Sequence, residues 1–89
     1  MFTVYILYSF SKDKYYIGQT NNLIHRIERH NENRVRATKF RGPWQLLYSE
    51  EYATRGEALK RERFLKSRKD RKFIEQIIAG WRTGTSAVS

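Results

Sequence analysis

Residues 3–30, TVYILYSFSKDKYYIGQTNNLIHRIERH, hold the pattern that decides the fold. Residues 2–10 are rich in β-branched and aromatic side chains and are apolar on both faces, which is typical of a central β-strand. The polar segment 11–14 predicts a turn, and the strand pattern resumes over 15–19. These two segments therefore predict a β-hairpin with a four-residue loop.

The hairpin places particular side chains together. A loop of this length puts odd residues of the first strand and even residues of the second strand on one face. Tyr5 and Tyr16 then project to the same side, together with Gly18. The glycine leaves a gap beside the two rings, where a side chain would block a close approach.

An amphipathic helix is expected after the hairpin, running through about Asn31 with Thr20 or Asn21 as its cap. Its core stripe is formed by Leu23, Ile24 and Ile27.

Arg26 and His30 lie one turn apart on the border of that stripe, while His25 and Arg29 point to solvent. From a border position, a polar group can lie over the sheet and still reach a ligand.

The middle of the chain predicts a loop, a strand and a second helix. Residues 32–43 lack periodicity, carry several cations and end in Gly-Pro, which favours a mobile basic loop. Residues 44–52 have the composition of a third strand. Thr54 and Glu57 form the S/T-x-x-E pattern of a capping box, so the second helix is expected to begin near residue 55.

Glu62 interrupts the apolar face of that second helix. A carboxylate on a core-facing stripe is costly unless a cation, hydrogen bonds or a metal ion compensates it. One alternative is therefore a salt-bridged carboxylate with Arg55, Lys66 or Arg26 as its partner. The apolar arc around it consists of Ala58, Leu59 and Leu65.

A third helix is expected after Ser67 as its cap, either separate from the second helix or continuous with it through a bend. Residues 82–89 predict a disordered tail, which leaves one domain over residues 1–81. The fold class is α/β (α+β), a small three-stranded antiparallel sheet flanked by three helices in the order β-β-α-β-α-α. The apolar face of the third helix comprises Phe73, Ile74, Ile77, Ile78 and Trp81.

The composition of the 89-residue chain points to a phosphate-rich partner. Eighteen Lys and Arg against nine Asp and Glu give a net charge of +9, and the cations concentrate in residues 26–41 and 55–72. There is no cysteine, which excludes disulfides and thiolate metal sites. No signal peptide or membrane span is recognised, so a cytoplasmic protein is expected and a membrane partner is not.

Tyr5, the Tyr16-Ile17-Gly18 triplet, Arg26, His30 and a later helical glutamate, Glu62, together resemble the GIY-YIG nuclease superfamily. The likeness is strongest to its small standalone bacterial members and weaker to the nuclease domain of excision-repair incision subunits. It covers residue 3 to about residue 78.

Two features depart from the family pattern. Its GIY triplet is replaced by Thr3-Val4-Tyr5, and no counterpart of its downstream asparagine follows Glu62.

The resemblance implies a catalytic set of Tyr5, Tyr16, Arg26, His30 and Glu62, with one Mg²⁺ or Mn²⁺ ion held by Glu62. A divalent ion on one carboxylate relieves negative charge at a phosphodiester, and Arg26 offers a planar fork to the phosphate. The general base is Tyr5, Tyr16 or His30, with Tyr16 assisted by His30 favoured.

Three functions remain open at this point. The first is a divalent-metal-dependent DNA endonuclease that selects structure (a flap, branch or nick) and acts as a monomer or weak dimer. The second is a weak or inactive nucleic-acid-binding module that acts with a protein partner. The third, a basic membrane-surface or protein-interaction domain, does not explain Glu62. The expected phosphate contacts are Arg34, Arg36, Lys39, Arg41, Lys60 and Lys66.

Overall fold

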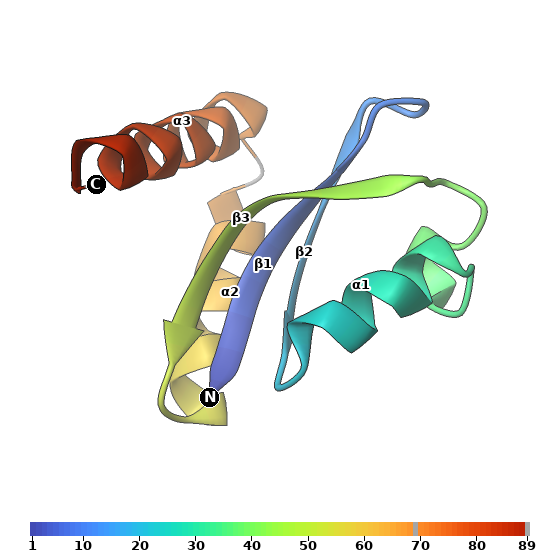
Figure 1. The fold of residues 1–89 in the computed structure, drawn as a ribbon, viewed down its shortest axis with the longest axis horizontal. Coiled ribbons are helices and arrows are strands. Elements are labelled where there is room, and N and C mark those ends of the chain that lie inside the picture. The colour runs from blue at the N-terminus through green and yellow to red at the C-terminus, as the bar shows by residue number, and fades with distance from the viewer. Residues whose placement is uncertain (69, 89) are drawn as a thin grey trace.

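The fold is a three-stranded antiparallel sheet with helices on both faces (Figure 1). A computed structural model describes residues 1–68 and 70–88, with side chains described up to residue 80. The strand order is β2-β1-β3, so the predicted central strand, antiparallel sheet and β-β-α-β-α-α order are all confirmed. The elements are β1 (Phe2–Ser9), β2 (Lys14–Thr20), α1 (Leu23–Asn31), the 3₁₀ turn η1 (Arg36–Thr38), β3 (Trp44–Tyr52), α2 (Arg55–Arg68) and α3 (Arg71–Val88).

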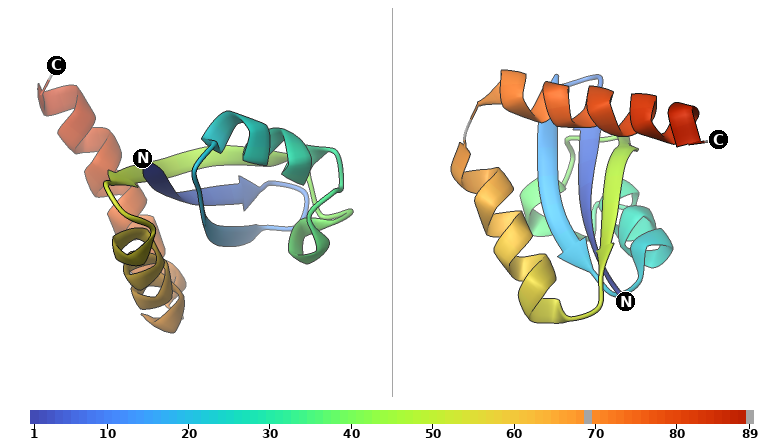
Figure 2. Two further views of the ribbon diagram at one scale, coloured as in Figure 1. Left: turned by 90° about the horizontal axis from the view of Figure 1, so that it is seen from below. Right: turned by 90° about the vertical axis from the view of Figure 1, so that its left-hand side faces the viewer.

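The alternating side chains of β1 divide the core into two layers. Val4 and Ile6 face α2 and α3, whereas Tyr5 and Leu7 face α1. Figure 2 shows α1 on one side of the sheet and α2 and α3 on the other. Because β1 is apolar on both faces, it is buried between the two layers, as the sequence predicts.

The start and rotation of α1 differ from the sequence-based expectation. Asn22 is the cap, because its side-chain Oδ1 accepts a hydrogen bond from the His25 N–H at 3.2 Å. The expected caps Thr20 and Asn21 are therefore wrong. Ile24, expected in the core, is 75% exposed, whereas His30 is fully buried. The helix is rotated about its axis in this way because His30 forms hydrogen bonds with polar groups beneath it, as described below.

The second helix begins where the sequence predicts. The Thr54 hydroxyl accepts a hydrogen bond from the Glu57 N–H at 3.2 Å and donates to the Glu57 carboxylate at 3.1 Å. The third helix is separate and is capped by Asp70, whose Oδ1 accepts from the Lys72 N–H at 3.0 Å. Ser67, the expected cap, instead lies within α2 and donates to a backbone carbonyl there.

The apolar face of α3 packs as expected for Phe73, Ile74, Ile77 and Ile78, while the side chain of Trp81 lies outside the described residues. The backbone of α3 continues to Val88, over most of the segment where the sequence predicts a disordered tail. Since side chains from 81 onward and residue 89 are not described, a domain boundary at residue 81 stays a prediction.

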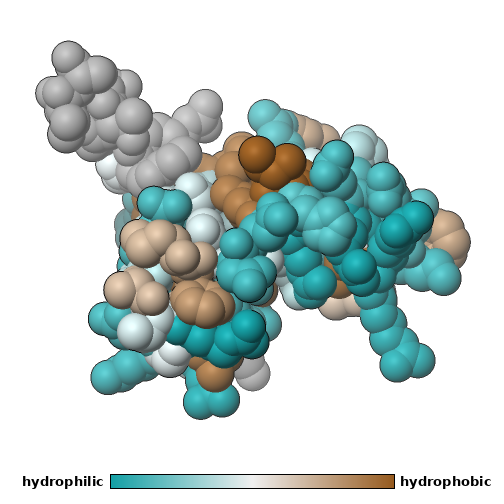
Figure 3. Space-filling model, turned by 60° about the horizontal axis from the view of Figure 1, so that its bottom comes forward, coloured by the Kyte–Doolittle hydropathy of each residue, from teal (hydrophilic) through white to brown (hydrophobic). Residues whose placement is uncertain are grey.

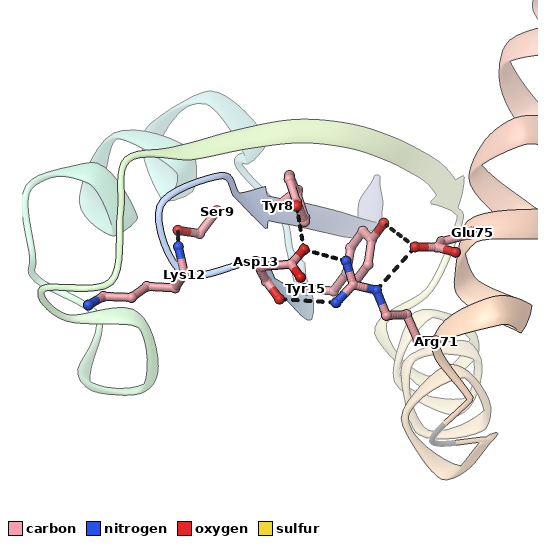
Figure 4. Close-up of polar contacts among 7 residues, drawn as sticks. All are labelled: Tyr8, Ser9, Lys12, Asp13, Tyr15, Arg71 and Glu75. Atoms are coloured by element: carbon pink, nitrogen blue, oxygen red, sulfur yellow. Dashed lines mark hydrogen bonds and ion pairs between the residues drawn. The ribbon is translucent and has the colours of Figure 1, made fainter.

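A polar cluster joins the tip of the β1–β2 hairpin to α3 (Figure 4). Arg71 forms ion pairs with Asp13 and with Glu75, the latter at 3.1 Å. The Tyr8 hydroxyl donates to Asp13 and the Tyr15 hydroxyl donates to Glu75. Each exposed ion pair contributes little by itself, but together the contacts fix where α3 crosses the sheet.

The surface drawn in Figure 3 is mostly hydrophilic, with apolar residues confined to small areas. Within residues 1–68 and 70–88, none of the helices combines the length and the apolar character that crossing a membrane requires.

Candidate active site

Two tyrosines and a glycine form the floor of the site, on the α1 side of the sheet. In the hairpin register Tyr5 lies opposite Gly18 and Leu7 lies opposite Tyr16, which brings the two tyrosine rings to 6.3 Å between centroids. A Cβ at position 18 would lie 2.6 Å from the Tyr5 hydroxyl oxygen and 3.0 Å from Cε2 of Tyr16. The glycine is therefore required for space, as the sequence predicts.

His30 lies against this floor and is fully buried. Its Nε2 is 2.9 Å from the Tyr5 hydroxyl oxygen, and its Nδ1 is 2.7 Å from the hydroxyl oxygen of Thr38. Because the Thr38 hydroxyl donates to the Val35 carbonyl, its oxygen is left to accept from the imidazole. This arrangement of hydrogen bonds gives His30 a proton on Nδ1 and leaves Nε2 to accept a hydrogen bond from the Tyr5 hydroxyl.

Burial keeps both members of the Tyr5–His30 pair uncharged near neutral pH. Loss of hydration raises the pKa of Tyr5 to about 12, although the nearby Arg26 guanidinium opposes the change. Loss of hydration, with the positive charge of Arg26, lowers the pKa of His30 to about 4. The pair therefore forms a neutral hydrogen-bonded support under the exposed part of the site.

Arg26 lies beside both phenols and lacks a carboxylate partner among the described residues. Interaction with the Tyr5 hydroxyl raises its pKa, with Tyr16 contributing in the same direction. Its Nε is buried and has no hydrogen-bond acceptor within the described part of the chain. The same is true of Nε of Arg29, which is half-buried rather than directed to solvent as expected. Such donors suit an anionic ligand such as a phosphate.

Glu62 comes to the site from the other layer. Its helix, α2, packs on the Val4 face of the sheet, opposite the face that carries Tyr5 and Leu7. The Glu62 side chain is only 14% exposed, and its Oε2 accepts a hydrogen bond from Nζ of Lys66 at 2.6 Å. That Nζ lies 5.9 Å from the centroid of the Tyr16 ring, and the charge of Glu62 helps to raise the pKa of Tyr5. The acid therefore approaches the phenols beside β2, an edge strand.

The donor set fits a magnesium-type ion held by one protein ligand. Among the described residues, no three His, Cys, Asp or Glu side chains gather as a metal-binding group. Glu62 has one oxygen engaged by Lys66, and no hydrogen bond to Oε1 is found in the described part of the chain. Mg²⁺ commonly keeps several waters and binds through one or two carboxylates plus substrate phosphates, which this arrangement permits.

The expected phosphate contacts lie in two groups, and all of their side chains are exposed. Arg34, Arg36, Lys39 and Arg41 lie on the loop between α1 and β3, which we call the basic loop (residues 32–43). Arg34 is ion-paired with Glu32 at 3.3 Å. The second group, Lys60 and Lys66, lies on α2.

The basic loop is anchored by contacts that the sequence does not signal. Asn31 accepts a hydrogen bond from the Trp44 N–H at 2.6 Å and donates to the Trp44 carbonyl at 3.2 Å. The Trp44 indole N–H donates to the Thr38 carbonyl at 3.2 Å. Thr38, which orients His30, lies in a stretch without periodicity, and no local pattern distinguishes it from the exposed residues around it.

The fold and these contacts define a small α+β domain in which two phenols, an imidazole and a guanidinium lie together. Residues 1–74 match the family model described as the GIY-YIG catalytic domain, and the chain belongs to this nuclease family. It is 32% identical over 68 residues to the UPF0213 protein YazA of Bacillus subtilis (strain 168), covering 72% of this chain and 69% of that one. It is 38% identical over 63 residues to a UPF0213 protein of Staphylococcus aureus (strain Mu3), covering 70% and 77%.

A solved structure gives the same answer for the fold. The solution NMR structure of the UPF0213 protein BH0048 from Bacillus halodurans superposes with a TM-score of 0.55 at 28% sequence identity, covering 89% of this chain and 84% of that one. The resemblance inferred from the sequence is thus confirmed at the level of family and fold. The names of these relatives state no activity.

The burial of His30 predicts a pH-dependent stability. Its folded-state pKa of about 4 lies below the ordinary value of 6.5, so the unfolded chain binds more protons in that interval. The free energy of unfolding should therefore fall as pH drops from about 6.5 to about 4. The free energy of unfolding, measured with denaturant at several pH values in this range, should depend less steeply on pH for His30→Gln than for the control His25→Gln. NMR titration of the His30 imidazole with a midpoint at or above 6.5 would contradict this account.

Proposed function

We propose that the protein is a divalent-metal-dependent endonuclease that hydrolyses phosphodiester bonds in DNA and selects branched, flapped or nicked structures. The observation that carries the proposal is the position of Arg26. Its guanidinium lies beside two phenols, with a buried Nε that has no acceptor among the described residues. Because Arg26 is only partly buried, its guanidinium can donate to a phosphate oxygen, and its charge stabilises the negative charge that accumulates in the transition state.

The two tyrosines have different roles in this proposal. Tyr5 is fully buried and hydrogen-bonded to His30, so it positions the guanidinium from below. Tyr16 is partly exposed and contacts His30 only through its ring, with centroids 4.9 Å apart. We therefore assign to Tyr16, after its own hydroxyl proton has passed to solvent and with Arg26 beside the resulting phenolate, the removal of a proton from the attacking water. His30 supports the site by holding Tyr5 beneath it.

Glu62 would hold the divalent ion, and Lys66, now paired with it, would move to a phosphate when the ion binds. The ion would supply charge relief at the phosphate and a more acidic water. A hollow of about 450 Å³ beside this edge of the sheet is lined by Tyr16, Lys66 and Arg71, among others, and offers a path for one strand of the substrate.

The basic loop and α2 then act as phosphate contacts on either side of the site. Such contacts position DNA without reading its sequence, which is why selection by structure is proposed. Single-domain organisation over residues 1–81, a monomeric or weakly dimeric state and a cytoplasmic location remain predictions from the sequence.

The test is cleavage of end-labelled flap, nicked, branched and linear DNA by the purified protein. We expect cleavage with Mg²⁺ or Mn²⁺, faster on the discontinuous substrates, and complete loss when EDTA removes the metal. Cleavage that is unchanged in EDTA would contradict the metal requirement.

A second candidate function has one specific observation in its favour, the Lys66–Glu62 ion pair, which occupies the carboxylate proposed to hold the ion. A nucleic-acid-binding module without turnover would bind DNA tightly and in a salt-sensitive way, and would not cleave it with either Mg²⁺ or Mn²⁺.

A further inference from the structure

We propose that Phe40 is a stacking platform for an unpaired base at the discontinuity of the DNA substrate. The inference rests on the proposed function only in taking DNA as the ligand. It names the residue in the basic loop that would distinguish a flap or branch from a continuous duplex.

Phe40 is an apolar ring exposed among cations. It is 72% exposed, between Lys39 and Arg41, and Nζ of Lys39 lies 5.1 Å from the ring centroid. The comparably exposed Phe10, at 68%, packs edge-on against Tyr8 with ring centroids 4.8 Å apart. Phe10 is thus packed against a neighbouring ring, whereas the ring of Phe40 is presented by a charged loop with a cation close to it.

The backbone holds Phe40 in an unfavourable conformation. Its φ of 62° lies in the left-handed region, which bulky side chains rarely adopt. The conformation is held by the Phe40 N–H, which donates to Oδ1 of Asn33 at 2.9 Å, and by the Arg41 N–H, which donates to the Thr38 carbonyl at 3.1 Å. Strain that the surrounding structure maintains tends to occur at ligand-binding positions.

The same loop is attached directly to the active site. Thr38, which contacts Nδ1 of His30 at 2.7 Å, precedes Phe40 by two residues, so their Cα atoms are at most about 7 Å apart. The Thr38 carbonyl is also fixed by the Trp44 indole at 3.2 Å. A base stacked on Phe40 would therefore be held by the loop that also orients His30.

The surrounding charge favours a nucleic acid as the occupant. Lys39 and Arg41, which precede and follow Phe40 in the chain, are exposed and offer phosphate contacts, in a chain of net charge +9. An aromatic ring stacks on any base, so it adds affinity without sequence preference. Bases inside a duplex are already stacked on their neighbours, so only an unpaired base is available to Phe40.

The experiment compares Phe40→Asn with Phe10→Ala by fluorescence anisotropy in EDTA, where no cleavage occurs. Asparagine tolerates the left-handed backbone, so the variant is expected to fold, and an unchanged melting temperature checks this. The probes are a DNA flap with unpaired bases, the same flap with abasic sites at the unpaired positions, and a linear duplex.

We expect Phe40→Asn to weaken binding of the base-containing flap about 10-fold or more, with little change for the abasic flap or the duplex. Phe40→Trp should retain flap binding, and Phe10→Ala should leave all three affinities unchanged. Equal weakening on all probes, or none on the flap, would overturn the proposal.

This binding comparison tests the role of Phe40 separately from the proposed catalysis. Wild-type protein that cleaves with metal but shows no effect of Phe40 refutes only the stacking platform. Flap binding that depends on Phe40 without any cleavage refutes only the endonuclease. The Phe40→Asn variant could also keep its DNA binding and lose the binding of another protein. That outcome would assign the ring to a protein partner and would overturn the proposal.

Discussion

Glu62→Gln is expected to remove metal-dependent cleavage, with a loss of roughly 1000-fold or more. Glutamine keeps the size of the side chain but lacks the negative charge that the proposed ion requires. The charge stabilisation that a bound divalent ion provides is worth several kcal/mol in the transition state, and each 1.36 kcal/mol is about tenfold in rate. The measurement is single-turnover cleavage of a labelled flap in Mg²⁺.

The matched control is Glu28→Gln, which removes the same charge from an exposed position on α1. Its cleavage rate should remain close to that of the wild type. Folding of Glu62→Gln is not at risk, because the lost ion pair with the half-exposed Lys66 contributes no more than about 1 kcal/mol. DNA binding in EDTA should therefore be retained. A Glu62→Gln protein that cleaves like the wild type would remove the acid from the proposed mechanism.

Gly18→Ala is expected to disrupt both the stability and the chemistry of the site. The added Cβ would lie 2.6 Å from the Tyr5 hydroxyl oxygen and 2.8 Å from its Cζ. The ring of Tyr5 cannot move aside freely, because it is fully buried and hydrogen-bonded to His30. We expect a loss of about 1–3 kcal/mol in the free energy of unfolding from overpacking.

The cleavage rate should fall about 100-fold, since a displacement of about 1 Å in a catalytic constellation can have that effect. Gly56→Ala is the control, because no atom lies within 4 Å of a Cβ at that position. It should leave stability unchanged or raise it by up to about 1 kcal/mol.

The double variant Gly18→Ala/Tyr5→Phe separates the two effects. Removing the Tyr5 hydroxyl removes the closest contact, so part of the stability should return while cleavage does not. Denaturant unfolding and single-turnover cleavage of the same proteins provide both readouts. Independent, additive losses in the double variant would show that the Cβ and the hydroxyl do not meet.

The sequence predicts the sheet and the floor of the site because these depend on local rules. The period of the strands and the length of the hairpin loop are enough to place Tyr5, Tyr16 and Gly18 together. The start of α2 follows from the Thr54 and Glu57 side chains, whose bonds span only three residues.

The sequence-based predictions are wrong where contacts between residues distant in the chain determine which side chains are buried. The pattern of α1 favours Ile24 as a core residue, yet His30 is buried instead, because Tyr5 lies 25 positions away and Thr38 lies 8 positions away with the hydrogen bonds it needs. Likewise, the helical arc of α2 shows Glu62 facing inward but cannot show which side of the sheet the helix covers. The catalytic roles of these residues stay predictions until cleavage is measured.

The attachment of the basic loop has a consequence for protein engineering. Ser9 and Ser11 donate hydrogen bonds to the backbone carbonyls of Arg41 and Gly42, and Asn33 accepts one from the backbone of Phe40. Because these tethers bind main-chain atoms, the side chains at positions 39 and 41 can change without breaking them, while position 40 requires a residue that tolerates the left-handed backbone. Libraries that randomise positions 39 and 41, and that keep position 40 to residues that accept a positive φ, should alter substrate preference while leaving the catalytic framework intact.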